Sequence, residues 1–305
     1  MPFLFLPSYF KFQKMANLKE IRNRIVSVGS TMQITSAMKM VSAAKLKKAQ
    51  DAITQMRPYS VKLQEILSNV SATLDISENA YSAQREVNNV LIVAVTSNRG
   101  LCGGFNNNII KRVNVMLNGE FKNANPKVLC LGKKVKDAFK RSEFYYTNES
   151  LAKAEDIFYD LTFDHNAQIA EELMSRFVNK EFDKVVVVYN QFVNAATQNV
   201  MTEQLLPIVP TEQEAGKSSG DYIFEPSKEE IVEDLIPKSL KIQLFKGLLD
   251  SQASEHGARM TAMHKATDNA SDLQKDLKLQ YNKARQAAIT NEILEIVGGA
   301  EALNN

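Results

Sequence analysis

The sequence is poor in the residue types that mark secreted, membrane-spanning and metal-binding proteins. Its 305 residues include no Trp, two Cys and three His. Because Cys102 and Cys130 alone cannot make a disulfide framework in a chain of this length, we expect a reducing compartment. No apolar run approaches the roughly 18 residues of a membrane-spanning helix. The sequence therefore predicts neither a disulfide-stapled secreted domain nor a membrane span.

The chain also lacks a strong net charge. The formal charge is +2, with 44% hydrophobic and 24% charged residues, as in a globular protein that can bury a core. So small a charge gives no reason to expect nucleic-acid binding. However, residues 11–48 are rich in Lys and Arg, with Glu20 as the single acid, whereas residues 212–234 are mostly acidic. The basic arm is either a solvated helix face or a surface that docks onto an acidic partner.

Phosphate-binding motifs are missing as well. Gly100, Gly103 and Gly104 follow an apolar strand, but their spacing matches neither the dinucleotide fingerprint nor the P-loop. No acidic residue ends the second strand, where ribose recognition would need one. We interpret the loop as a structural turn, with a nucleotide site as the less favoured alternative.

Residues for metal or acid–base chemistry are few. His256 and His264 lie eight residues apart in one predicted helix, too far to chelate one ion directly, and no acidic or Cys cluster accompanies them or His165. No nucleophile elbow, Ser–Lys pair or paired-carboxylate signature appears. We expect no catalytic residue, no metal site and no cofactor.

What the sequence does contain is a helical stripe at each end. In segment 228–303 one position recurs at alternating steps of four and three from Leu249 to Ala270, and the series continues from Leu273 to Asn291, which predicts a long helix with one partner-facing side. Its members are Leu249, Ala253, His256, Met260, Met263, Thr267, Ala270, Leu273, Leu277, Tyr281, Ala284, Ala288 and Asn291. Segment 16–75 has a matching stripe, which comprises Leu18, Ile21, Ile25, Val28 and Met32. We expect the two helices to pair as an antiparallel coiled coil.

The N-terminal helix carries its own start and break signals. Asn17 can cap it, with Glu20 in the capping-box position. Pro58 should kink or break it. Residues 1–15 open with an apolar stretch that is broken by prolines and not followed by a small-residue cleavage site, so they fail as a signal peptide. We expect them to be a disordered leader.

Between the helices, at 88–210, the period changes to that of strands. Short apolar runs alternate with amphipathic segments, which predicts an α/β domain with a largely parallel sheet. Strands are predicted over residues 90–96, 127–131, 144–147, 184–189 and 200–209, the last two as a hairpin. The polar stretches 75–88 and 211–227 are predicted to be a linker and a surface loop.

The two ends strongly resemble the gamma subunit of F-type ATP synthases. The matching strings are KEIRNRIVSV, QITSAMKMVSAAKLKKAQ and MRPYS within 19–60, TSNRGLCGGFN at 96–106, and SEHGARMTAMHKATDNASDL and LQYNKARQAAITNEILEIVGGAEAL within 254–303. The resemblance covers essentially all of residues 16–303. It implies an antiparallel coiled coil of both termini plus a Rossmann-like domain that binds no nucleotide.

The same resemblance implies a non-catalytic rotor, the central stalk that couples proton flow to ATP synthesis or hydrolysis and regulates ATPase activity. Its partners would be the alpha and beta subunits of the catalytic head, the epsilon subunit and the proteolipid ring. The chain would be peripheral to the bacterial plasma (inner) membrane, on the cytoplasmic side.

Individual positions carry over where the motifs align. The residues that resemble the family's beta-subunit contacts are Met38, Arg259, Arg285, Gln286, Thr290 and Glu292. Ile296 and Val297 resemble the apolar tip in the top bearing. The rival interpretations are a static coiled-coil scaffold and a nucleotide-dependent enzyme on the Rossmann-like domain.

Overall fold

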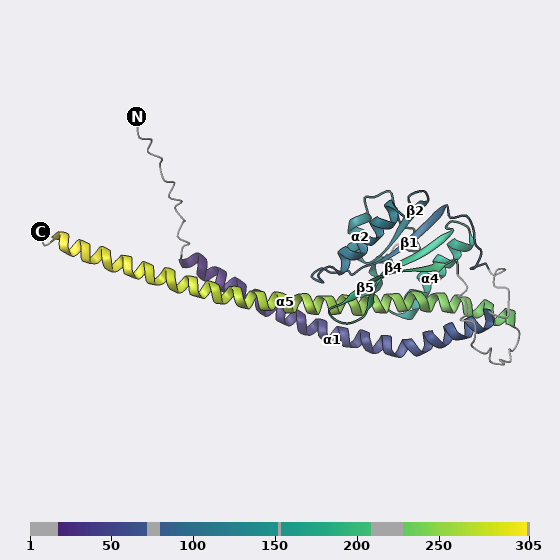
Figure 1. Ribbon diagram of the computed structural model, residues 1–305, viewed down its shortest axis with the longest axis horizontal. Helices are drawn as coiled ribbons and strands as arrows, with labels where there is room; N and C mark the ends of the chain where they lie inside the picture. Colours follow the sequence, from purple (N-terminus) through teal and green to yellow (C-terminus); the bar gives the residue numbers. More distant parts are fainter. Residues whose placement is uncertain (1–17, 72–79, 152–153, 209–227, 304–305) are drawn as a thin grey trace, which may run out of the picture. The chain divides into compact units, whose positions relative to one another are not determined.

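The computed structural model describes residues 18–71, 80–151, 154–208 and 228–303. The predictions for the leader 1–15, the Asn17 cap and the loop 211–227 lie outside the described residues. A long helix forms each end of the described chain, and an α/β domain lies between them in the sequence, which confirms the predicted fold class (Figure 1). The chain divides into two compact units. One is Met38–Ala262, and the other combines the chain up to Ala37 with the chain from Met263.

The first unit is built on a five-stranded sheet in the order β3-β2-β1-β4-β5. Its strands are β1 (Asn89–Val95), β2 (Asn125–Leu131), β3 (Tyr145–Tyr146), β4 (Lys184–Phe192) and β5 (Gln198–Leu206). All neighbouring strands are parallel except β4 and β5, which form the predicted antiparallel hairpin. Central β1 is apolar from Val90 to Val95, as expected of a strand whose two faces are both covered by helices.

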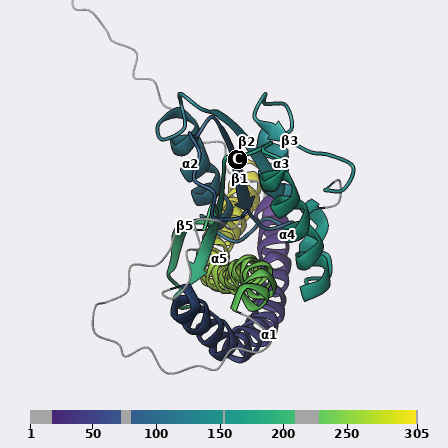
Figure 2. The ribbon, with the colours of Figure 1, turned by 90° about the vertical axis from the view of Figure 1, so that its right-hand side faces the viewer.

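Helices cover the two faces of the sheet (Figure 2). On one face lie α2 (Phe105–Asn118) and α3 (Lys133–Phe139), through Ile109, Val113, Met116 and Val135. On the other lie the 3-10 helix η2 (Ala154–Tyr159), α4 (Phe163–Val178) and part of α5 (Lys228–Leu303). The α5 side chains buried there step along one helix face and are Ile236, Leu240, Leu244 and Leu248.

The N-terminal helix α1 (Leu18–Ser71) packs on α5 within the same unit. Leu46 and Ala49 meet Ala253, and these small or flexible side chains allow close approach of the two helices. The predicted break at Pro58 is wrong, because α1 continues through it to Ser71. The alternative, a kink at Pro58, stays a prediction. Leu63, beyond the proline, is only 6% exposed, so packing holds the helix on both sides of it.

The second unit is the antiparallel pair formed by the start of α1 and the end of α5. Thr35 Oγ1 and Thr267 Oγ1 share a hydrogen bond of 2.8 Å, and Gly29 lies opposite Gln274. The predicted stripe holds at Ala270 and Leu277 but fails at Leu273, which is 48% exposed. Leu273 lies off the alternation of four and three steps, which places Gln274 between Ala270 and Leu277, and Gln274 is half-buried.

Candidate functional site

The glycine-bearing loop after β1 is closed on itself. The Ser97 amide and hydroxyl both donate to Asn106 Oδ1, at 2.9 and 3.0 Å. Asn106 Nδ2 in turn donates to the Cys102 sulfur at 3.1 Å. Gly103 takes the left-handed backbone conformation, with φ of 59°, that the turn into α2 requires. These groups satisfy one another, which favours the structural turn over a phosphate cradle.

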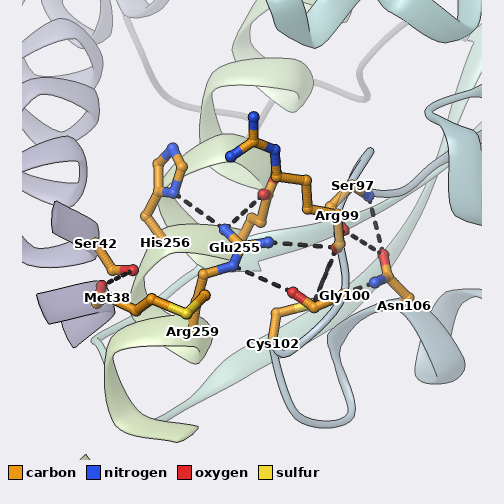
Figure 3. Close-up of polar contacts among 10 residues, drawn as sticks. All are labelled: Met38, Ser42, Ser97, Arg99, Gly100, Cys102, Asn106, Glu255, His256 and Arg259. Carbon is orange, nitrogen blue, oxygen red and sulfur yellow. Dashed lines mark hydrogen bonds and ion pairs between the residues drawn. The ribbon is translucent and has the colours of Figure 1, made fainter. Parts of the chain in front are cut away.

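Arg259 on α5 fastens this loop to the helix (Figure 3). Its guanidinium pairs with Glu255 one turn earlier, with Nη1 to Oε1 at 2.7 Å. The other nitrogens donate to the carbonyl oxygens of Gly100 and Arg99, each at 3.3 Å. Arg259 is only 7% exposed and so acts as a buried crosslink between helix and loop.

The Glu255–Arg259 ion pair lies near two further positive charges, those of Lys45 and Arg99. Burial raises the pKa of the Glu255 carboxyl, and Arg259 opposes the rise. Burial also lowers the pKa of His256 to about 4, assisted by the positive charges of Arg259 and Lys45. His256 is therefore neutral at pH 7 and is a weak candidate for acid–base work there.

Met38 lies on α1 in the same unit and is half-buried. Its carbonyl oxygen accepts a hydrogen bond from Ser42 Oγ at 2.7 Å (Figure 3). The family resemblance assigns Met38 and Arg259 to one contact with the beta subunit, which stays a prediction.

The sequence patterns did not predict the roles of Glu255 and the two loop carbonyls as partners of Arg259. The only available signal was the four-residue spacing of Glu255 and Arg259, which is typical of a helix ion pair.

The remaining predicted contact residues lie near the end of α5, in the second unit. Arg285, Gln286, Thr290 and Glu292 are all exposed, and the Thr290 hydroxyl bonds back to the Gln286 carbonyl oxygen at 2.9 Å. Ile296 and Val297 are 71% and 55% exposed. Their assignment to partner subunits also stays a prediction.

Several large apolar side chains near this end of α5 are not packed against any other described part of the chain. They are Ile289, Ile293, Leu294, Ile296 and Val297, exposed by 47–71%. From residue 289 to residue 301 every position is exposed. A soluble chain seldom leaves such a cluster uncovered unless a partner binds it.

The other candidate ligands are dispersed or engaged. His165 Nδ1 lies 3.0 Å from the Asp160 carbonyl oxygen, and His264 pairs with Asp268 one turn later. In the described ranges, no three His, Cys, Asp or Glu side chains are grouped as a metal site would need. Burial raises the pKa of both Cys102 and Cys130, the latter to about 12, so neither is a reactive thiolate at neutral pH.

None of the helices that the structure describes combines the length and apolar character of a membrane crossing.

Comparisons with known proteins agree over nearly the whole chain. The family model described as ATP synthase matches residues 17–303. The ATP synthase gamma chain of Flavobacterium johnsoniae is 62% identical over 95% of this chain and 100% of its own length. That of Chlorobium phaeobacteroides is 48% identical over 95% and 99%.

Solved structures share the fold. A chain in the mitochondrial ATP synthase of Euglena gracilis, solved with OSCP, F1 and the c-ring, has a TM-score of 0.65 at 22% identity and 94% coverage of both chains. A chain in the central stalk and c-ring of the Tetrahymena thermophila enzyme has a TM-score of 0.54 at 24% identity, covering 76% of this chain and 99% of its own. The chain belongs to the gamma-chain family of the ATP synthases.

Proposed function

We propose that this chain is the rotating central stalk of a proton-translocating ATP synthase. It would couple proton flow through the membrane sector to ATP synthesis or hydrolysis in the catalytic head, and regulate ATPase activity. The observation that carries the proposal is the exposed apolar end of α5, from Ile289 to Val297, on a helix whose earlier part is anchored on the sheet. Such a helix can present uncovered side chains to partners while its base stays folded.

The chain itself would be non-catalytic in this role. The alpha and beta subunits would hold the nucleotides, which agrees with the closed loop at Ser97–Asn106. The epsilon subunit and the proteolipid ring would be the remaining partners. The chain would thus be peripheral to the bacterial inner membrane, on its cytoplasmic side, through the complex.

Coupling requires that each orientation of the stalk contact one beta subunit differently from the others. A rotor can shift a catalytic site between conformations only by the difference in its contacts with them. We assign that difference to two groups of residues. Met38 and Arg259 form the lower group, and Arg285, Gln286, Thr290 and Glu292 form the upper one. Ile296 and Val297 would turn in an apolar bearing at the top.

The first test is assembly. The chain should co-purify with alpha and beta subunits as an active ATPase, and single-molecule imaging should show it turning during hydrolysis. Assembly without rotation would support a static scaffold instead. Tight ATP or NAD binding to this chain alone, measured by calorimetry, would revive the enzyme interpretation.

The second test is the substitution Met38→Lys. The new ammonium should pair with beta-subunit acids and stabilise one orientation of the stalk by about 1.5 to 3 kcal/mol, which hinders its rotation out of that orientation. We expect intact assembly and fewer protons pumped per ATP hydrolysed, measured by quenching of a pH-sensitive dye in vesicles. The matched control is Met40→Lys, at a methionine that is 65% exposed two residues further on. Equal coupling in the Met38 variant and the wild type would contradict the assigned role.

A further inference from the structure

A cavity of about 300 Å³ lies in the Met38–Ala262 unit, between α1, the end of β4 and α5. Its volume is at the lower end of the range for small-molecule sites. One part of its lining is apolar and consists of Ile53, Met56, Phe192 and Leu249. The other part is polar and consists of Arg57, Ser60, Gln191, Lys246 and Asp250. The family's contact residues described above are not among them.

Asp250 is the group in this lining that most needs a partner. It is only 5% exposed, yet its carboxylate makes no hydrogen bond or ion pair with any described residue. A buried carboxylate without a partner is costly, so native structures normally supply one. Because Asp250 lines the cavity, a molecule inside the cavity could supply that partner.

Two positive charges stand at the cavity without an ion pair to Asp250. Arg57 on α1 and Lys246 on α5 are exposed. Their positive charges lower the pKa of Asp250, but by less than burial raises it. From β5 the Glu203 carboxylate also acts on Asp250, but Glu203 accepts a hydrogen bond from the Tyr189 hydroxyl at 2.6 Å. The net effect of burial and these charges is to raise the pKa of Asp250 to about 6.

The ligand must therefore do two things at once. It must donate a hydrogen bond to Asp250 and offer negative oxygens to Arg57 and Lys246. Carboxylates and sulfates are fully ionised at neutral pH and have no proton to donate. A phosphomonoester has its second pKa near 6, so a site that needs a donor can bind its monoanion, which has both a P–OH donor and charged acceptor oxygens.

We propose that this cavity binds a small phosphomonoester. Arg57 and Lys246 would hold the phosphate oxygens, Asp250 would accept the phosphate O–H, and the wall of Ile53, Met56, Phe192 and Leu249 would cover an apolar ester group. The assignment concerns this chain alone and does not depend on the rotor role.

The test uses three probes on the assembled ATPase, with its nucleotide sites saturated by a non-hydrolysable ATP analogue. Phenylphosphonate has an apolar ring and a proton to donate. Benzenesulfonate has the same shape but no donor, and inorganic phosphate lacks the ring. We expect density for phenylphosphonate in the cavity by cryo-electron microscopy, and at least about tenfold weaker binding of the other two probes by saturation-transfer NMR. Benzenesulfonate would lose one charge-assisted bond, and inorganic phosphate would lose the burial of the ring.

Variants separate the roles of the groups. Arg57→Gln and Lys246→Gln should each weaken phenylphosphonate binding by about tenfold or more. Asp250→Asn replaces the carboxylate with an uncharged amide that can donate as well as accept, so it should remove the preference for phenylphosphonate over benzenesulfonate. Lys238→Gln, at an exposed lysine earlier on α5, should change nothing. An empty cavity at saturating phenylphosphonate, or an unchanged preference in Asp250→Asn, would overturn the proposal. Inorganic phosphate that binds as tightly as phenylphosphonate would overturn the ester assignment.

Discussion

The sheet of the first unit and the helix pair of the second unit are stabilised in opposite ways. Along β1 every residue from Val90 to Val95 is 0% exposed, with large branched side chains packed on both faces. The helix pair instead joins through a Thr35–Thr267 hydrogen bond and a glycine facing Gln274. Most of its surface, including large apolar groups near the end of α5, is exposed. The sheet unit is therefore the stable platform, and the helix pair keeps its side chains available for partners.

The largest effect is expected at Arg259, which joins α5 to the loop after β1 within the Met38–Ala262 unit. Arg259→Met would leave Glu255 buried without its partner and should lower the free energy of unfolding by about 3 to 5 kcal/mol. Urea unfolding of the purified chain would measure it. Replacing both residues, as Arg259→Met with Glu255→Leu, should restore most of the loss because no charge is then stranded. If the free energy of unfolding of Arg259→Met lay within about 1 kcal/mol of the wild-type value, the pair would not be a structural crosslink.

The next effect is expected at Gly132, at the end of β2. Its φ is 110°, and a Cβ there would lie 2.0 Å from the Thr96 carbonyl oxygen. Gly132→Ala therefore forces both backbone strain and a shift of β1, and should cost about 3 kcal/mol or more. Thermal and urea unfolding should agree on the loss. A tolerated Gly132→Ala would mean that the sheet is less rigid than its burial indicates.

The third prediction concerns the pH dependence of the sheet unit. Burial is the main cause that raises the pKa of Asp250 from 3.8 to about 6. The native state therefore holds its proton more tightly than the unfolded chain between these values, so this group's contribution to stability falls as pH rises from about 4 to 6. The full penalty, present above about pH 6, is at most about 3 kcal/mol. The urea midpoint of Asp250→Asn should therefore rise relative to that of the wild type as the pH is raised from about 4 to about 7.5. A gap that does not vary with pH would contradict this.

The smallest effect is expected in the helix pair and has the opposite sign. A Cβ on Gly29 would meet only the end of the Gln274 side chain, at 2.8 Å, which can rotate away. Gly29→Ala also improves helix propensity, so it should stabilise the chain by about 0.5 to 1 kcal/mol. Set beside Gly132→Ala, the same substitution tests whether the two units differ in tolerance. A loss of stability in Gly29→Ala would mean that the pair is packed as tightly as the sheet.

Much of the fold was predictable because it rests on local periodicity. The run from Val90 to Thr96 predicted a strand buried on both faces, and β1 occupies 89–95. The strand predicted over 184–189 and its hairpin partner also formed, as β4 and β5. The two terminal helices followed from their stripes. The glycine loop was interpreted as a structural turn because it lacks a phosphate motif, and its polar groups do hydrogen-bond to one another.

Other features depended on contacts between distant residues. Gly100 and Arg259 are separated by 159 positions, and no pattern near either one reveals that they meet. The unpartnered state of Asp250 likewise appears only when α1, β4 and α5 are packed together. Pro58 lies within a continuous helix because packing on both sides outweighs a local break. The sequence by itself determined which segments become helices and strands, since those choices depend on neighbouring residues. The tertiary structure decided which charges are paired, buried or left facing a cavity, because that depends on which surfaces meet.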